Sequence, residues 1–237
     1  MPAGTVYAGT SGWAYASWRP KFYPAKLGAA KFLEHYATRL NSVEVNFSFG
    51  NDLTPKILAD WVAATPNGFL FAVKANQSIT HRKRLRGAAR PTAKFLKSLE
   101  PLRAARKLGP VLFQLPPNLK CDLALLEGFL ATLPPNIRSA MEFRHASWFT
   151  EDVYDRLGRA NVALCEAESE KLVTPEIATA DFRYFRLRKG KYSPAARKKI
   201  AAKAREAARN GDVFVYFKHE DTPEGALHAE ALLKAAQ

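Results

Sequence analysis

Short apolar runs alternate along this chain with longer segments in which apolar residues recur every three or four positions. The short runs are rich in β-branched and aromatic residues, which is typical of strands that are buried on both faces. We therefore expect eight β-strands. They are the runs 6–13, 42–49, 69–76, 111–115, 139–144, 162–166, 182–187 and 213–217.

Segments with helical spacing follow seven of these eight runs. The helix after the seventh run has the clearest boundaries, because Ser193 is a favourable N-cap, Pro194 suits the first helical position and Gly211 lies just past the end. Pro101 is expected to kink or divide the segment that contains it. The seven helical segments are 30–40, 54–64, 91–107, 123–133, 151–159, 194–210 and 224–235.

The order of these elements predicts the fold class. Apolar strands that alternate with helices indicate a parallel sheet whose outer side is covered. Eight such units in 237 residues favour a single α/β domain over residues 1–237, a (β/α)8 TIM-like barrel. Residues 167–181 lack a helical pattern and contain Pro175, so we expect an irregular crossover between strands six and seven. An open doubly wound sheet is the alternative, but no Gly-rich dinucleotide motif follows the first run.

The chain is strongly basic, since 36 Lys and Arg residues against 22 Asp and Glu residues give a net charge of +14. Such a charge suits an anionic partner such as nucleic acid or a phosphorylated ligand, although a solvated basic surface accounts for it equally well. The two cysteines, Cys121 and Cys165, have no metal-binding spacing, which favours reduced thiols. Because no apolar run of about 18 residues and no export leader occurs, we expect a cytoplasmic protein without membrane contact.

Polar residues concentrate at the carboxyl ends of the predicted strands, whereas the first halves of the strands are almost entirely apolar. In barrels of this kind the carboxyl ends of the strands carry the active site. Charged side chains inside a barrel lack solvent, so they must pair with one another or contact a ligand. We expect Glu44, Lys74 and Glu142 to be catalytic, and Glu166 and Glu168 end strand six in the same way. Further ligand-binding side chains are expected at Trp13, Tyr15, Trp18, Asn46, His81, Gln114, Arg144, Trp148, Arg186, Arg188 and Lys218.

The fifth strand shows how side chains are expected to divide between the two faces of the sheet. Glu142 and Arg144 share one face and Phe143 lies on the other, so the charged pair is expected to point into the barrel mouth. His145 has the opposite parity and reaches the site only if the backbone turns there. Trp148, farther along, is expected to form a wall of the pocket.

The loop after the third strand carries the cations Arg82, Lys83, Arg84 and Arg86, with Arg90 close by. Like charges at this density repel one another unless an anion neutralises them. The first loop interleaves aromatic residues with cations, and both loops are expected on the rim of the pocket. Cations with aromatic neighbours suit phosphates and stacked bases, so single-stranded nucleic acid is an expected partner. The alternative is that loops are simply where charged residues are solvated.

Five segments, spread in order over nearly the whole chain, share a further pattern. They are GTSGW at 9–13, NSVEVN at 41–46, FAVKA at 71–75, LGPVLFQLPP at 108–117 and EFRH at 142–145. Together these segments resemble the YecE-like family, which is catalogued as a domain of unknown function and predicted to form a TIM-like barrel. The resemblance implies the same barrel and supplies no established reaction.

Three rim segments depart from that family's pattern. The family usually has Phe-Tyr after the second strand, where this chain has FG at 49–50. After the seventh strand it often has Arg-x-His-Gly, where this chain has RLRK at 186–189, and strand eight often ends in Phe-Asn-Asn, where this chain has FKH at 217–219. Two of the changes introduce cations, so the ligand of this chain is expected to differ from that of most relatives.

Three functions remain open at this point. The first is a hydrolase or lyase that acts on a phosphorylated or nucleic-acid substrate, with Glu44 or Glu142 as general base. In that enzyme Lys74 and Arg186 would stabilise developing negative charge. The second is a non-catalytic barrel that binds nucleic acid through its basic rim. The third is a small-molecule enzyme whose basic surface is incidental. We favour an enzyme with an anionic ligand.

No cofactor is identified by the sequence. A divalent metal bound by Glu44, Glu142, His145 and His219 is an alternative, but no paired-ligand spacing favours it. A Schiff base on Lys74 is a further alternative, which requires that the amine be desolvated.

Overall fold

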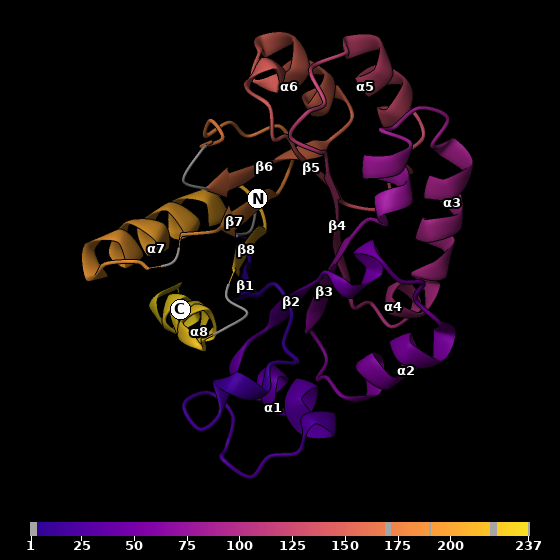
Figure 1. Cartoon of the computed structure of the whole chain (residues 1–237). Coiled ribbons are helices and arrows are strands. Elements are labelled where there is room, and N and C mark those ends of the chain that lie inside the picture. The colour runs from indigo at the N-terminus through magenta and orange to yellow at the C-terminus, as the bar shows by residue number, and fades with distance from the viewer. Residues whose placement is uncertain (1–3, 169–171, 190, 219–221, 237) are drawn as a thin grey trace.

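Eight parallel strands form one sheet in the computed structural model of this protein, and the sheet curls into a nearly closed barrel (Figure 1). The structure describes residues 4–168, 172–189, 191–218 and 222–236. From β2 onward each strand pairs with the next one along the chain, and β8 pairs with β1. The predicted (β/α)8 barrel is therefore confirmed. The strands are β1 (Val6–Thr10), β2 (Ser42–Val45), β3 (Leu70–Lys74), β4 (Leu108–Gln114), β5 (Ser139–Glu142), β6 (Val162–Glu168), β7 (Arg183–Leu187) and β8 (Val213–Phe217).

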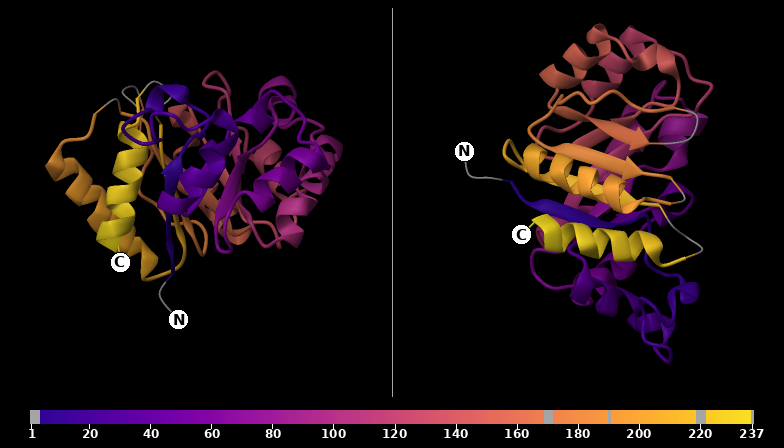
Figure 2. Two further views of the ribbon diagram at one scale, coloured as in Figure 1. Left: turned by 90° about the horizontal axis from the view of Figure 1, so that it is seen from below. Right: turned by 90° about the vertical axis from the view of Figure 1, so that its left-hand side faces the viewer.

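Helices cover the outside of the strands. They are α1 (Phe32–Arg39), α2 (Pro55–Ala63), α3 (Ala89–Ser98), α4 (Glu100–Ala104), α5 (Leu123–Leu130), α6 (Glu151–Arg159), α7 (Pro194–Ala208) and α8 (Glu224–Ala236). The predicted segment 91–107 is divided at Leu99, because Pro101 suits the first turn of a new helix. Figure 2 shows α7 and α8 side by side, and α8 packs against β1 and β8. As predicted, residues 172–181 of the crossover between β6 and β7 contain no helix.

None of the described helices is long and apolar enough to cross a membrane.

Helix α7, whose boundaries are the clearest in the sequence, begins as predicted. The Ser193 hydroxyl accepts a hydrogen bond from the Ala196 N–H at 3.2 Å.

Several strands end before the predicted residue: β1 ends at Thr10 instead of residue 13, β3 at Lys74 instead of 76 and β5 at Glu142 instead of 144. Strand β2 ends at Val45 instead of residue 49, and Phe47–Phe49 forms a 3-10 turn. The Ser48 hydroxyl donates a hydrogen bond to the Lys74 carbonyl oxygen at 2.6 Å, which fastens this turn to β3. The segment Ser78–Arg82, expected as part of a basic loop, is a single π-helical turn. Such turns occur frequently at functional sites.

Side chains alternate between two buried layers along each strand. On β5, Met141 and the following Phe143 join the outer core beneath the helices, whereas Ala140 and Glu142 face the barrel interior. This is the division that the sequence predicted. The apolar part of the interior is formed by Ala72, Leu112, Ala140, Ala163, Cys165, Phe182, Tyr184, Phe214 and Tyr216. Above that layer, toward the carboxyl ends of the strands, the interior is polar.

Strands β1 and β2 meet at a seam that relies on side chains. A bridge between Ser11 and Glu44 joins the two strands just beyond the end of β1. Lower in the seam, the Asn41 side chain accepts a hydrogen bond from the Ala8 N–H and donates one to the Val6 carbonyl, both at 2.9 Å. An amide side chain carries the same donor and acceptor as a peptide group. It therefore continues the ladder between the strands.

Tyr36 of α1 closes the upper part of the same seam. Its hydroxyl accepts a hydrogen bond from the Thr10 N–H at 2.8 Å and donates one to the Ser42 carbonyl at 3.0 Å. The side chain is completely buried. A β-carbon at Gly9 would lie 1.9 Å from the Ser42 carbonyl oxygen, so the close approach of the two strands requires glycine there.

Candidate functional site

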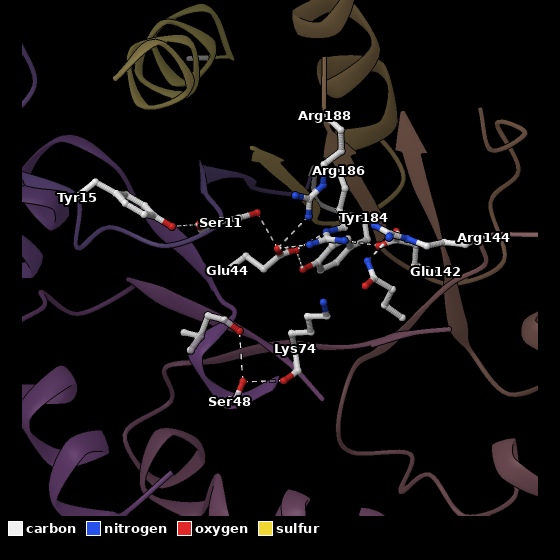
Figure 3. A network of polar contacts seen from close by, with 12 residues as sticks. Ser11, Tyr15, Glu44, Ser48, Lys74, Glu142, Arg144, Tyr184, Arg186 and Arg188 are labelled. Atoms are coloured by element: carbon white, nitrogen blue, oxygen red, sulfur yellow. Dashed lines mark hydrogen bonds and ion pairs between the residues drawn. The ribbon is translucent and has the colours of Figure 1, made fainter. Parts of the chain in front are cut away.

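Arg186 of β7 lies between two carboxylates in the centre of the barrel mouth (Figure 3). Its Nε and Nη2 donate to the two oxygens of Glu44 at 2.8 and 2.7 Å, a bidentate geometry. Its Nη1 donates to Oε2 of Glu142. The exposed fractions of the three residues are 1%, 0% and 2%, respectively. Three charges from β2, β5 and β7 are thus buried together at the carboxyl ends of their strands.

Neutral groups complete the hydrogen bonding of both carboxylates. Ser11 donates to Oε1 of Glu44 at 2.8 Å, and the Tyr184 hydroxyl donates to Oε2 at 2.7 Å. Gln114 donates to Oε1 of Glu142 at 2.8 Å. Buried charges are tolerated when they are paired and their remaining lone pairs are satisfied. The cluster meets that condition, and it includes four of the predicted site residues, Glu44, Gln114, Glu142 and Arg186.

Glu142 is strongly held as an anion. Burial by itself raises the pKa of its carboxyl, but Arg186 and Arg144 outweigh burial and lower the pKa to about 2. The carboxylates in turn raise the pKa of the Arg186 guanidinium, against the effect of burial. A carboxylate with such a low pKa is a weak proton acceptor. The structure therefore disfavours the general-base role predicted for Glu142, and Glu44 is engaged at both oxygens.

Two further arginines stand above this cluster. Arg144, whose side chain is 43% exposed, donates from Nε to Oε1 of Glu142 at 2.9 Å. Arg188 places Nη2 3.6 Å from Oε1 of Glu44, and its buried Nε has no hydrogen-bond partner in the described structure. Both keep N–H groups available to a ligand, because guanidinium carries five donors.

Lys74 of β3 differs from the other cations of the mouth. Its amine lies 3.9 Å from the ring centre of Phe49 and forms no ion pair or hydrogen bond within the described ranges. In Figure 3 the side chain points toward the Arg186 cluster. The pKa of the amine is lowered to about 8, chiefly by burial and next by the Arg186 charge, while Glu142 and Glu44 raise it. His81 packs its edge on Phe49 at 4.9 Å, and burial and the Lys74 charge lower its pKa.

The predicted ligand contacts of Trp18 and Trp148 are contradicted by their complete burial. Trp148 lies flat on Phe143 with ring centres 4.6 Å apart, and its Nε1 donates to the Leu119 carbonyl at 2.7 Å. Trp18 packs on Phe22 at 5.5 Å. Both rings belong to the outer core cluster and have no exposed surface for a ligand.

The remaining predicted residues lie around the mouth with different degrees of contact. Tyr15 donates to the Ser11 carbonyl at 2.9 Å and so supports a residue of the cluster. Trp13 is half-buried against Trp61, with ring centres 5.2 Å apart. Asn46 has a buried Oδ1 without a hydrogen-bond partner in the described structure. The side chain of Lys218 is exposed.

The four rim cations do not behave as one group. Arg84 donates to Asn118, and Arg86 forms an ion pair of 3.4 Å with Asp122. Arg82 and Lys83 are exposed and form no ion pair among the described residues. The expectation that these cations lack a neutralising partner is thus corrected for Arg86, since Asn118 is neutral and leaves the charge of Arg84 in place.

Glu166 and Glu168 do not reach the mouth, because they lie on the outward face of β6. Glu166 accepts from Arg183 Nε at 2.9 Å and pairs with Lys203 of α7 at 2.7 Å. Glu168 accepts from the Tyr192 hydroxyl at 2.8 Å. The prediction that strand six adds carboxylates to the site is therefore wrong, since its parity places them outside.

No group of three or more His, Cys, Asp and Glu side chains in the described ranges could hold a metal ion. The carboxylates of Glu44 and Glu142 instead accept hydrogen bonds from the Arg186 guanidinium. The ring of His145 accepts a hydrogen bond from the Ser147 N–H at 3.1 Å and caps a 3-10 turn. His219, the last of the proposed ligands, lies outside the described residues.

Sequence reasoning missed three contributors to the site: Ser11, Phe49 and Tyr184. Tyr184 shares the strand parity of Arg186, so strand alternation was the signal that places it inside the barrel. Ser11 follows β1 and reaches Glu44 only because the seam brings β1 beside β2. Phe49 lies in a turn that the sequence predicted as strand, so no periodicity pointed to its contact with Lys74.

Comparisons with known proteins point to one family. The family model described as "Protein of unknown function DUF72" matches residues 7–237. The UPF0759 protein YunF of Bacillus subtilis is 32% identical over 160 residues, which are 64% of this chain and 55% of that protein. The chain thus spans about half the length of this curated relative.

Solved structures agree with the barrel. A crystal structure of a DUF72 family protein from Thermotoga maritima superimposes with a TM-score of 0.86 at 26% identity and covers 97% of this chain and 98% of that one. A DUF72 family protein from Enterococcus faecalis has a TM-score of 0.81 at 18% identity, with 97% and 96% covered. At that identity the second likeness shows the fold alone.

Proposed function

This chain belongs to the DUF72 family of proteins of unknown function, and we propose that it is an enzyme whose barrel mouth binds a small anionic ligand beside Lys74. The resemblance to YecE-like proteins refers to this same family. The observation that carries the proposal is the Lys74 amine, a half-buried cation that faces the cluster and has no carboxylate partner among the described residues. A buried charge that is unpaired is costly unless a ligand uses it.

The charge balance of the mouth supports an anion. Among the residues that the structure describes, four cations face two carboxylates there: Lys74, Arg144, Arg186 and Arg188 against Glu44 and Glu142. The excess is positive, and the cations that lack full pairing are those nearest solvent. Phosphate and carboxylate groups are the anions that arginine recognises best, through its paired N–H donors.

Lys74 is suited to transfer a proton or to act as a nucleophile. With a pKa of about 8, about a tenth of its amine is neutral at pH 7, far more than for an ordinary lysine. A neutral amine attacks a carbonyl carbon and forms a Schiff base with loss of water. Schiff-base formation supports a lyase, and activation of water by the neutral amine as a general base supports a hydrolase, with Lys74 as the reacting group in either case.

Under this proposal Glu44 and Glu142 are positioning residues. They hold Arg186 rigidly and orient Arg144 and Arg188 above the cluster. Preorganised donors of this kind stabilise negative charge without reorganisation during the reaction.

The proposal can be tested without a known substrate, by labelling with pyridoxal 5′-phosphate followed by borohydride reduction. This reagent joins an aldehyde to a phosphate, so it should modify Lys74 in preference to exposed lysines. We expect peptide mass spectrometry to find the label on Lys74, inorganic phosphate to compete with it, and the rate to rise with a midpoint near pH 8. Above that pH the amine is neutral, and below it the protonated amine does not react.

Two variants control this labelling experiment. Lys74→Met should remove the principal labelled peptide, and Lys97→Met, a change of an exposed lysine on α3, should leave labelling of Lys74 unchanged. Labelling spread evenly over exposed lysines, without competition by phosphate, would exclude the proposed reactive site.

Single-stranded nucleic acid is a second candidate ligand, favoured by the rim. Arg82 and Lys83 are exposed, and Phe47 in the neighbouring turn is 48% exposed. Cations beside an accessible aromatic ring suit phosphates and stacked bases. In this alternative the barrel need not be catalytic, and charge reversal at Arg82 and Lys83 should weaken binding and reduce its salt dependence.

A further inference from the structure

A cavity lies outside the barrel, beside the segment that follows β3. It has a volume of about 770 Å³, within the range of about 300–1,000 Å³ that is usual for small-molecule sites. Its walls come from the loop after β2, the segment 76–87 that follows β3, and the helix α3. None of Lys74, Arg144, Arg186 and Arg188 lines it. It is therefore a separate site, and its properties do not depend on the reactivity proposed for Lys74.

Three cations line this cavity, Lys83, Arg90 and Lys94, and the acidic side chain in its walls is Asp52. None of the three cations forms an ion pair or a side-chain hydrogen bond in the part of the chain that the structure describes. The structure thus gathers cations from the end of the π-helical turn and the first turns of α3 around one hollow. Cations so placed repel one another, and a bound anion removes the repulsion.

The other walls suit a ring-bearing molecule. Phe95 and Pro91 supply apolar surface on one side, and Asn51 and Ser78 supply polar groups. The apolar area allows a planar ring to be buried, while an amide and a hydroxyl can bond to its edge or to hydroxyl groups. Asn76, which lines the cavity, donates a hydrogen bond to the Ser48 carbonyl at 3.1 Å and so joins the segment after β3 to the turn after β2.

We propose that this cavity binds a phosphorylated small molecule of nucleotide size, with its phosphate on Lys83, Arg90 and Lys94. The phosphate neutralises the cations, and the ring packs on Phe95. A phosphomonoester carries nearly two negative charges at neutral pH, which matches a hollow with three cations and one carboxylate. The same chemistry occurs in free mononucleotides and at the end of a nucleic acid strand, and the volume favours the free molecule.

Isothermal titration calorimetry of the full chain with adenosine 5′-monophosphate tests this proposal. The mononucleotide should bind, inorganic phosphate should compete with it, and adenosine without the phosphate should bind far more weakly. The double variant Arg90→Gln and Lys94→Gln should weaken binding of the mononucleotide at least about tenfold, since a hydrogen bond to a charged group is worth roughly 1.5–3 kcal/mol.

Matched controls separate this site from a general effect of charge. The double variant Lys97→Gln and Arg103→Gln removes the same charge from exposed positions of α3 and α4 that do not line the cavity, and it should bind the mononucleotide as the unchanged protein does. Lys74→Met should also bind it normally, which distinguishes this site from the barrel mouth.

Three results would overturn the proposal. They are no heat of binding and no competition with any mononucleotide, equal weakening in both double variants, or binding of single-stranded oligonucleotides alone. The last result would assign the cations to the nucleic-acid rim instead. Circular dichroism of each variant checks that the fold is retained, so that loss of binding has a local cause.

Discussion

At the scale of single residues, the mouth depends on a guanidinium shared by two buried carboxylates. Removing one partner of such a group leaves an uncompensated charge in a medium that solvates it poorly. Glu142 is 2% exposed and Arg186 is 1% exposed, so water cannot replace the missing partner without a change of structure. We therefore expect a substitution of any one of these charged residues to destabilise the folded protein strongly.

Glu142→Gln should lower the free energy of unfolding by about 3–5 kcal/mol, the usual cost of breaking a buried ion pair. The amide keeps the shape of the side chain but withdraws the charge that Arg186 faces. Urea unfolding followed by circular dichroism measures the change. Arg144→Gln is the matched control, because that side chain is 43% exposed and its pair with the same carboxylate should be worth at most about 1 kcal/mol. Similar small losses in both variants would contradict a desolvated cluster.

At the scale of elements, the barrel is closed by α1 as well as by strands. Tyr36 bridges β1 and β2 with one hydroxyl, and Asn41 at the start of β2 continues the ladder below it. The position of Ser11 against Glu44 depends on this closure, since both lie directly above the seam. A helix side chain thus sets the geometry of one side of the mouth.

Tyr36→Phe should lower the free energy of unfolding by about 1–3 kcal/mol, because the Thr10 N–H and the Ser42 carbonyl lose a partner in a buried place. Amide hydrogen exchange of Thr10 should accelerate in the variant. Tyr154→Phe serves as the comparison, since Tyr154 is also buried and its hydroxyl has no hydrogen bond among the described contacts. If Thr10 exchanged equally slowly in both variants, the seam would not depend on Tyr36.

At the scale of the whole molecule, Glu142 links stability to acid pH. Its pKa falls from an ordinary value near 4.5 to about 2 in the folded protein, so the unfolded chain binds the proton more readily. The contribution of Glu142 is complete above pH 4.5 and is lost as the pH falls toward 2. It amounts to about 3 kcal/mol at neutral pH, by the usual relation between a pKa difference and free energy.

Unfolding free energies of the protein and of Glu142→Gln should therefore converge at acid pH. We expect the difference between them to be largest near pH 6 and to shrink between pH 4.5 and pH 2. Urea titrations at several pH values measure it. The general acid destabilisation of a chain with a net charge of +14 affects both proteins, so the difference isolates Glu142. A difference that stayed constant down to pH 2 would show that Glu142 is not held as an anion.

The sequence predicted much of the fold and part of the candidate site. Helix α6 and strand β8 have the bounds that periodicity and flanking turn residues predicted, and α7 begins at the predicted cap. Strand parity correctly placed Glu142 inside and Phe143 outside, because neighbouring side chains on a strand point to opposite faces. The same alternation places Glu166 on the outer face, next to the inward-facing Cys165. Its position at the end of a strand instead led to the wrong prediction that it lies in the mouth.

By itself the sequence determined the barrel and the face on which polar residues gather, because both follow from local periodicity and from the rule that parallel strands share one carboxyl edge. Only the tertiary structure decided which charges meet. It paired Arg186 with Glu44, a residue 142 positions away, buried Trp18 and Trp148, and left Lys74 without a carboxylate partner in the described part of the chain. These outcomes depend on closure of the sheet and on how each loop turns, which are set by contacts between distant residues that no local pattern contains.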